Sequence, residues 1–340
     1  MERTGLGIDL ANNVFQLHGV DAQGHVGARK KLTRQKLLPF VAQLAPCRIG
    51  LEACQGAHHW ARAMRKLGHD VRLSSPQCVT PDRQSHKNDP NAAAAICEAV
   101  SRPHMRFVPI QEVEPQAIQA LHRARQLLIK QRTALCNQVR GLLSEYGIVV
   151  AQGVHRLRTS RPALLEDADN GLTFASRELF QALYQQLVWL DERIGGMDST
   201  IHQVFTTNEA CQRLADIEGV GPMIATALYA AVPQPHLFHN GRHLAAWMGL
   251  VPRQHSTGGK ALLLGISKRG DRSLRALLIQ GARAGVYRWE DKLNPSPRAR
   301  GLQQLRARRG INCATVALAH KIARVAGVRL SQGVQYQPAG

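Results

Sequence analysis

The sequence predicts an α/β domain followed by all-α regions. Segments with strand character alternate with amphipathic helical segments over about the first hundred residues. Strand signals then vanish between about residues 115 and 205, where Leu, Ile and Val recur at helical spacing among Arg, Gln and Lys. Beyond residue 211 the pattern is mostly helical and is interrupted by glycines. We therefore expect four parts: an α/β domain at residues 1–114, a helical, coiled-coil connector at 115–208, a mostly helical domain at 209–330 and a disordered tail at 331–340.

The α/β domain is predicted to begin with a meander of three strands. Strands at residues 6–10 and 14–20 are joined by a turn at Asn12-Asn13, and the third strand lies near residues 24–32. Helix and strand then alternate: a helix at 33–44, a strand at 48–52, a helix ending near 67, a strand at 70–73 and a helix from Pro90. This order of elements is that of the ribonuclease H-like fold.

The connector is predicted to contain two long helices, at residues 116–146 and 176–205, separated by a stretch with Gly and Pro at 147–171. Such a pair can form a coiled-coil arm for dimerisation or RNA contact. Because the heptads are imperfect, a plain helical-bundle connector explains the pattern equally well.

The charge of the chain points to a polyanionic partner. Its 340 residues carry 44 Lys and Arg against 24 Asp and Glu, a formal charge of +20. A compact domain tolerates this self-repulsion poorly unless nucleic acid offsets it. No apolar run approaches the roughly 18 residues of a membrane-spanning helix, and no signal sequence precedes the first strand. With seven scattered cysteines that read as reduced thiols, we expect a cytoplasmic, nucleoid-associated protein without a membrane partner.

Three acidic residues occur where a charge is unusual. Asp9 interrupts the first apolar strand, Glu52 ends the fourth strand, and Asp89 precedes the helix from Pro90. Two carboxylates in one crevice repel each other unless a divalent cation lies between them. Taken singly, each residue is also explained as a cap or a surface charge. Their joint placement predicts a Mg²⁺ site that is suited to hydrolysis or transfer of a phosphodiester.

A serine in a cationic stretch is a candidate nucleophile. Ser256 begins the turn-forming sequence STGG at residues 256–259. The cations that flank it are Arg253, Lys260, Lys268 and Arg269. Such cations stabilise the charge of an attacked phosphate, and glycines let backbone N–H groups approach the anion. The same sequence is also an ordinary loop.

Two further patterns suggest phosphate contacts. The sequence IEGVGP at residues 217–222 is typical of a helix-hairpin-helix, in which Gly219 and Gly221 let backbone amides meet phosphate without sequence readout. A purely structural helix turn explains it as well. Arg272, Arg275 and Arg283 have near-helical spacing and can follow a nucleic-acid backbone, or form a solvated basic face.

Several sequence blocks, in this order, carry a family resemblance. They are GIDL at 7–10, GLEAC at 50–54, AHHW at 57–60, KND at 87–89, SRPHMRFVP at 101–109, GLVPRQHSTGGK at 249–260 and LGISKRGD at 264–271. The chain resembles the DEDD transposases of the insertion-sequence 110 family, subgroup 1111, over nearly its whole length. The resemblance implies a RuvC-like, Mg²⁺-dependent first domain and a serine that forms a transient phosphoserine link to DNA. We prefer Ser256 to Thr257 for this role.

The resemblance also implies binding partners, and the chain departs from the family pattern at one position. Its partners are donor and target DNA, a guide RNA (bridge RNA) encoded by the element, and further copies of the chain in a dimer or tetramer. The family has a fourth carboxylate three residues after the third, on the same helical face. Here that position is Ala92, which cannot bind metal. We interpret the chain as an RNA-guided DNA transposase or recombinase. The alternatives are a structure-selective nuclease of the Holliday-junction type and a catalytically blocked nucleic-acid-binding form.

Overall fold

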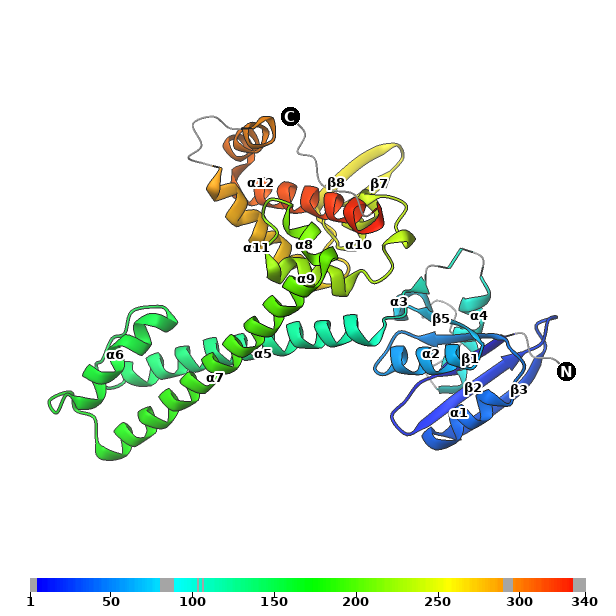
Figure 1. Cartoon of the computed structure of the whole chain (residues 1–340), viewed down its shortest axis with the longest axis horizontal. Helices are drawn as coiled ribbons and strands as arrows, with labels where there is room; N and C mark the ends of the chain where they lie inside the picture. The colour runs from blue at the N-terminus through cyan, green and yellow to red at the C-terminus, as the bar shows by residue number, and fades with distance from the viewer. Residues whose placement is uncertain (1–4, 80–88, 103, 106, 290–295, 333–340) are drawn as a thin grey trace. The chain divides into compact units, whose positions relative to one another are not determined.

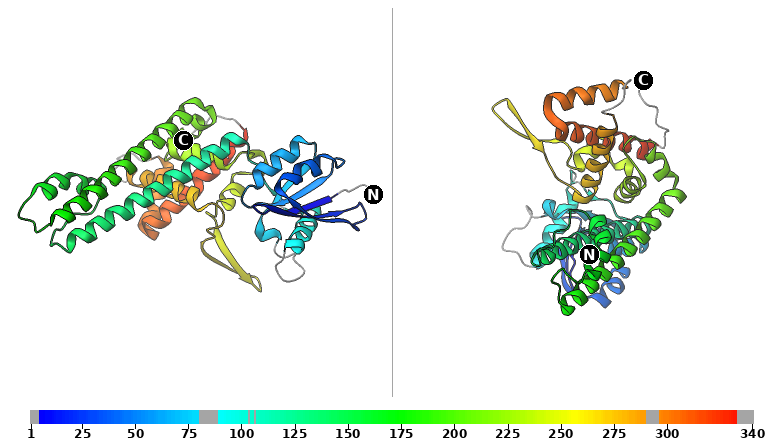
Figure 2. Two further views of the ribbon diagram at one scale, coloured as in Figure 1. Left: turned by 90° about the horizontal axis from the view of Figure 1, so that it is seen from below. Right: turned by 90° about the vertical axis from the view of Figure 1, so that its left-hand side faces the viewer.

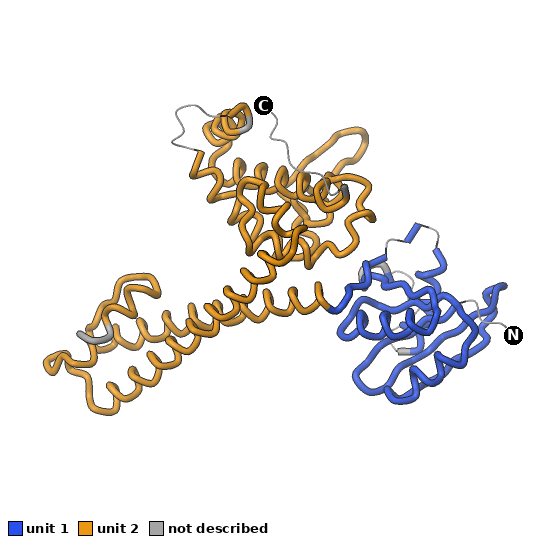
Figure 3. The backbone as a smooth tube through the Cα atoms, viewed as in Figure 1, with its two compact units in different colours: residues 1–113 blue, residues 114–340 orange. Residues whose placement is uncertain are grey.

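The computed structural model describes residues 5–79, 89–102, 104–105, 107–289 and 296–332. The chain divides into two compact units, residues 1–113 and residues 114–340, which Figure 3 shows in different colours. The predicted disordered tail lies almost wholly outside the described residues. The six cysteines whose side chains the structure describes, Cys47, Cys54, Cys97, Cys136, Cys211 and Cys313, are free thiols.

Unit 1 is built on a sheet of six strands in the order β3-β2-β1-β4-β5-β6 (Figure 1). The strands are β1 (Gly5–Asp9), β2 (Val14–Val20), β3 (Val26–Thr33), β4 (Arg48–Glu52), β5 (Asp70–Ser74) and β6 (Phe107–Val108). The meander of β1, β2 and β3 is antiparallel, whereas β4 and β5 continue from β1 in parallel. The first five strands lie where the sequence predicts them. The edge strand β6 was not predicted, because two residues show no periodicity.

Helices cover both faces of this sheet. On one face, α1 (Arg34–Ala42) and α2 (Ala57–Lys66) pack on alternate apolar side chains such as Leu6 and Ile8. The other face receives α4 (Asp89–Ser101), and glycines let it approach closely. A Cβ on Gly7 would lie 2.2 Å from the Ala93 carbonyl oxygen. The short helix α3 (Pro76–Val79) precedes α4.

Unit 2 begins with a helical arm formed by α5 (Val113–Ser144), α6 (Val154–Glu166) and α7 (Phe174–Thr207) (Figure 2). The two long helices match the prediction. They pack through apolar side chains that include Val139, Leu143 and Leu187. Helix α6 was not predicted, because the glycines that flank it made its segment resemble a loop.

The rest of unit 2 is a helical bundle with one β-hairpin. Its elements are α8 (Glu209–Ala215), α9 (Pro222–Ala231), the 3₁₀ turn η2 (Pro235–Leu237), α10 (Gly241–Trp247), β7 (Pro252–Thr257), β8 (Lys260–Ile266), α11 (Arg272–Arg288) and α12 (Pro297–Gln332), which is kinked at Gly310. The mostly helical prediction is confirmed. Within the described part of the chain, no helix is both long and apolar enough to cross a membrane.

The hairpin differs from the sequence-based expectation, which placed Ser256 in turn residues. Strands β7 and β8 pair in antiparallel register, and Ser256 lies opposite Ala261. Gly258 and Gly259 both adopt positive φ, of 55° and 76°, as a two-residue type I′ turn requires. Glycine therefore closes the hairpin two residues beyond Ser256.

Candidate active site

Asp9 and Glu52 end adjacent parallel strands. Ile8 lies opposite Leu51 in the register of β1 and β4, so the next residues, Asp9 and Glu52, are neighbours at the carboxyl edge of the sheet. Side chains alternate along a strand, and Ile8 and Leu51 belong to the core beneath α1 and α2. Asp9 and Glu52 therefore project on the opposite face, which α4 covers, and both are partly buried.

The electrostatics of Cys54 report on both carboxylates. Burial, the larger cause, raises the pKa of the Cys54 thiol, and the negative charges of Glu52 and then Asp9 raise it further. Both carboxylates thus lie close enough to the same half-buried thiol to raise its pKa.

Helix α4 directs its amino end toward this edge. A Cβ on Gly5 would meet the Sγ of Cys97 at 3.8 Å, whereas a Cβ on Gly7 would meet the Ala93 carbonyl. As β1 runs toward Asp9, α4 thus runs back toward its first residue, Asp89. The backbone therefore places the start of α4 on the side of Asp9 and Glu52. The Asp89 side chain lies outside the described residues.

Ala92, where the resemblance implies a fourth carboxylate, lies in the first turn of α4. Its side chain is buried, with 7% exposed. It lies one turn before Ile96, whose side chain would be 3.1 Å from a Cβ on Gly50 of β4. An aspartate here would face the strand that ends at Glu52, so the position suits a ligand although alanine supplies none.

The donors that remain fit magnesium. Ser74 ends β5 opposite Glu52, and its hydroxyl is fully buried without a hydrogen-bond partner among the described residues. An orphaned buried hydroxyl is costly, and a hydrated cation beside Glu52 would satisfy it. Asp9, Glu52 and Ser74 offer oxygen donors here, the ligand type that Mg²⁺ prefers. No three His, Cys, Asp or Glu side chains within the described residues form a metal-binding group.

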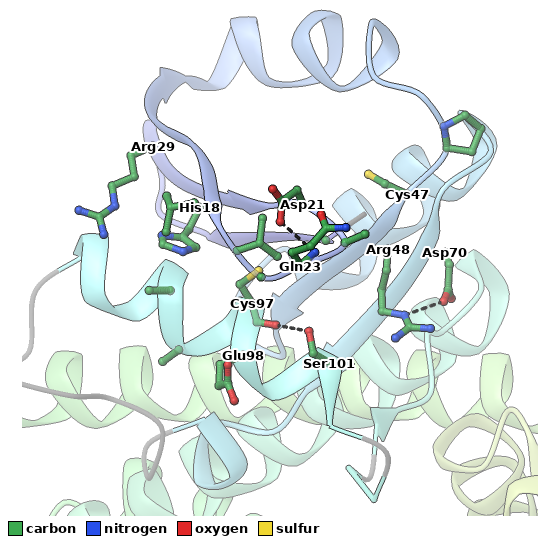
Figure 4. A pocket seen from close by; sticks show the side chains of 18 of the residues that line it. His18, Asp21, Gln23, Arg29, Cys47, Arg48, Asp70, Cys97, Glu98 and Ser101 are labelled. Carbon is green, nitrogen blue, oxygen red and sulfur yellow. Dashed lines mark hydrogen bonds and ion pairs between the residues drawn. The ribbon is translucent and has the colours of Figure 1, made fainter. Parts of the chain in front are cut away.

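A broad cleft in unit 1 lies elsewhere. It is lined by residues at the amino ends of the parallel strands, including Gly5, Arg48 and Asp70 (Figure 4). Gly5 is four residues from Asp9, or about 13 Å along a strand. The Arg48 guanidinium donates to Asp70 at 3.3 Å inside the cleft. The lining of the cleft does not include Asp9 or Glu52, although it reaches Asn91 near the start of α4.

The candidate nucleophile lies on an exposed ribbon in unit 2. The Ser256 hydroxyl oxygen accepts a hydrogen bond of 2.9 Å from the side-chain amide of Gln254, two residues earlier on the same face of β7. This bond occupies a lone pair of the oxygen and leaves its proton available for transfer. Arg253 and Lys260 are exposed on the ribbon, and Lys268 and Arg269 are exposed where it joins the bundle. Sequence reasoning missed Gln254 because it did not identify the strand.

A turn joins α8 to α9 where the sequence suggests a helix-hairpin-helix, and its two glycines have different surroundings. Gly219 has a φ of 89°, and its carbonyl oxygen would lie 2.3 Å from a Cβ on Gly281 of α11, so this part of the hairpin packs against the bundle. Glu218 accepts a hydrogen bond from the buried Trp289 indole. Gly221, at the start of α9, is exposed and has open space around it.

The expectation that Arg275 contacts a nucleic-acid backbone is wrong. Its side chain is buried, with 8% exposed, and donates to main-chain carbonyls inside the bundle. Arg272 is exposed, and Arg283 donates to Asn312 at 3.0 Å.

Comparison with known proteins shows the family to which the chain belongs. The DEDD-type transposase family of IS110 elements matches residues 6–148, and the transposase IS116/IS110/IS902 family matches residues 211–297. The chain is 46% identical over 99% of its length to the whole of a probable family 20 transposase of Pseudomonas aeruginosa. It is 44% identical over 98% of its length to the transposase for insertion sequence element IS1111A of Coxiella burnetii, of which 91% is covered. A putative transposase of Sinorhizobium fredii, y4pF/y4sB, is 40% identical over 98% of the chain and 86% of its own length. The chain therefore belongs to the IS116/IS110/IS902 family of transposases.

Proposed function

We propose that this transposase cuts and rejoins DNA with two cooperating groups. Asp9, Glu52 and Asp89 bind Mg²⁺ in a RuvC-like domain, and Ser256 is the nucleophile. The observation that carries the proposal is the pair Asp9 and Glu52 at the ends of adjacent parallel strands, beneath the start of α4. Two neighbouring carboxylates with a buried, unsatisfied hydroxyl beside them support a cation site over a pair of surface charges.

Each step is a transfer of a phosphodiester. The Oγ of Ser256 forms a bond to phosphorus while one P–O bond of the DNA backbone breaks, and the departing sugar oxygen takes up a proton. Attack by a hydroxyl of another DNA end on the phosphoserine then restores Ser256, so the number of phosphoester bonds is conserved. The Gln254 amide holds the serine oxygen, and Arg253, Lys260, Lys268 and Arg269 offset the charge of the phosphate. Bound Mg²⁺ supplies Lewis-acid stabilisation of that phosphate.

The nucleic-acid partners are donor DNA, target DNA and a guide RNA encoded by the element. A formal charge of +20 supports binding to backbone phosphates, which leaves sequence choice to base pairing with the RNA. The helical arm within residues 115–208 provides the surface for assembly into a dimer or tetramer.

Ala92 supports a second candidate, a form that binds nucleic acid without turnover. A buried alanine on the face of α4 toward Glu52 removes one carboxylate from the set. A set with one ligand fewer binds Mg²⁺ more weakly.

The deciding experiment traps the covalent intermediate. The chain and its Ala92→Asp variant, each loaded with RNA, are incubated with nicked donor DNA and Mg²⁺, and denaturing gels are scanned for a protein–DNA adduct. We expect an adduct that is stronger with Ala92→Asp, is lost with Ser256→Ala and persists with Thr257→Ala. Cleavage without an adduct identifies the Holliday-junction type of nuclease. Tight binding without cleavage in the original chain, with activity restored by Ala92→Asp, identifies the blocked form.

A further inference from the structure

The ribbon that carries Ser256 has almost no packing of its own. All residues of β7 and all but the last residue of β8 are exposed, including Leu262, Leu263 and Leu264. A two-stranded hairpin is marginally stable by itself. Its direction relative to the bundle is therefore set where its two ends join the bundle. We call these ends, residues 248–251 and 267–270, the hairpin neck.

The neck is closely packed and hydrogen-bonded. The Ser267 amide donates to the Val251 carbonyl at 2.8 Å, and the Lys268 amide donates to the Gly249 carbonyl at 3.1 Å. Gly249 and Gly270 both have positive φ. A Cβ on Gly249 would lie 2.2 Å from the Arg269 carbonyl oxygen, a distance that no side chain tolerates.

A buried arginine joins both ends of the neck. Helix α11 begins at Arg272, and its N-cap Asp271 accepts from the Ser273 and Leu274 amides. One turn into this helix, the Nη1 of Arg275 donates to the Met248 carbonyl at 3.1 Å and to the Arg269 carbonyl at 2.8 Å. One carbonyl precedes the hairpin and the other follows it, so a single nitrogen holds the entering and leaving chains together.

We propose that Arg275 is a positioning residue that fixes the direction of the Ser256 ribbon relative to the bundle. The inference rests on the proposed role of Ser256 in catalysis. A buried guanidinium is costly unless its donors are used, and here the carbonyls it satisfies are those of the neck. Attack on phosphorus requires Ser256 Oγ to lie close to in line with the breaking bond, and a displacement of about 1 Å costs roughly 100-fold in rate. Arg275 thus acts on the reaction through the main chain, without touching DNA.

The test compares Arg275→Met and Arg275→Lys with a second buried arginine. Arg329 is 4% exposed and donates to the Arg213 carbonyl and to Asp216, away from the neck, so Arg329→Met is the matched control for loss of a buried guanidinium. Hydrogen exchange is measured on variants that keep Ala92. We expect exchange of the Ser267 and Lys268 amides to accelerate about tenfold or more in Arg275→Met, because these bonds lose the group that holds their carbonyl segments. In Arg275→Lys the exchange rate of these amides should lie between those of the original chain and Arg275→Met. Arg329→Met should leave the amides protected.

The second measurement is the rate at which the protein–DNA adduct forms. It uses the same variants with Ala92→Asp added, at saturating DNA. Arg275→Met should slow the rate of adduct formation roughly 100-fold while DNA affinity stays within about twofold, and Arg275→Lys should restore part of the rate. The inference is overturned if a folded Arg275→Met protein exchanges its Ser267 and Lys268 amides as slowly as the original chain. It is also overturned if Arg329→Met loses as much protection at these amides as Arg275→Met does. If no variant forms an adduct at Ser256, the proposed function fails, while the exchange experiment still decides whether Arg275 holds the neck. If Arg275→Met does not fold, the same two readouts on Arg275→Lys decide the matter.

Discussion

Asp9 and Glu52 bring two acidic side chains to one edge of the sheet in unit 1. Both residues are neighbours on the sheet face under α4. At the opposite edge, Asp70 lies beside two arginines. Burial tends to raise the pKa of Asp70, but hydrogen bonds and charges from Arg72 and Arg48 outweigh burial and lower it. A cation can therefore be held by acidic ligands at the first edge, whereas arginines already compensate the charge of Asp70 at the second.

Neutralising one member of the pair should remove the stabilisation that Mg²⁺ gives the protein. We expect Asp9→Asn or Glu52→Gln to lose the increase in Tm that Mg²⁺ produces, because each variant removes one charged ligand of the proposed site. The control Asp70→Asn should lower stability by less than about 1 kcal/mol, since its ion pairs are exposed, and should keep the response to Mg²⁺. An intact response to Mg²⁺ in Asp9→Asn would contradict the metal site.

His122 provides a prediction for pH. Burial, followed by the charge of Arg125, lowers the pKa of His122 to about 4. Thr226 uses its proton for the Pro222 carbonyl, so the His122 Nε2–H donates to the Thr226 hydroxyl at 3.0 Å. Between pH about 6.5 and about 4 the unfolded chain binds a proton at this site and the folded protein does not, so stability falls as pH falls.

A variant without this histidine should lose less stability as the pH falls. We expect His122→Gln, which keeps a donor toward Thr226, to reduce the loss of stability between pH 6.5 and 4 by about 2–3 kcal/mol. Urea unfolding at a series of pH values measures the difference. His155 is exposed on the arm, and His155→Gln should leave the curve unchanged. If the free energy of unfolding depends on pH in the same way in His122→Gln and in the original chain, protonation of this histidine does not affect folding.

At the scale of elements, the arm is held by apolar packing and by ion pairs of unequal burial. Asp191 of α7 is 12% exposed and pairs with Arg132 of α5, at 2.8 Å, and with Arg158 of α6. Asp198, further along α7, is 41% exposed and pairs with Arg125 of α5. Asp191 is therefore a largely buried carboxylate that connects three helices, whereas Asp198 forms one more exposed ion pair between two helices.

These two carboxylates should differ in their contribution to stability. We expect Asp191→Ala to lower the free energy of unfolding by about 2 kcal/mol, because the variant removes a carboxylate that is only 12% exposed and leaves Arg132 and Arg158 without their partner. Asp198→Ala should cost less than about 1 kcal/mol. Chemical denaturation measures both. Equal effects would mean that burial of the ion pair does not matter to the arm.

The elements also show which parts of the fold the sequence can predict. Strands β1 and β4 combine buried apolar residues with a terminal carboxylate, and this local pattern was enough to place Asp9 and Glu52. The β7–β8 hairpin has exposed leucines in succession and no alternation, so its strands were read as a loop. The burial of Arg275 depends on carbonyls of Met248 and Arg269, which tertiary structure alone brings to it. Local periodicity therefore predicts the sheet, whereas long-range packing decides the serine region.

For the whole molecule, charge determines how nucleic acid is held. The 44 basic residues exceed the 24 acidic ones in a chain of 340. Binding that releases counterions from phosphates weakens steeply with salt. We expect the affinity for guide RNA or DNA to fall by orders of magnitude between about 50 and 200 mM salt, as several neutralised phosphates require. Filter-binding titrations at a series of salt concentrations give the slope. An affinity that hardly depends on salt would contradict a phosphate-dominated interface.

The largest-scale prediction concerns which copies of the chain supply one active site. The carboxylates belong to unit 1 and Ser256 to unit 2, and helices of 32 and 34 residues separate them in sequence. In an assembly that shares sites, Ser256 of one copy attacks DNA held at the carboxylates of another. We therefore mix two inactive forms, both carrying Ala92→Asp: one with Ser256→Ala, the other with Asp9→Ala. Random mixed dimers contain one site with both groups intact, so strand-transfer activity should return to roughly a quarter of the Ala92→Asp level. Light scattering and differential tagging verify that mixed assemblies form. Mixed assemblies without any recovered activity would show that each copy uses its own serine with its own carboxylates.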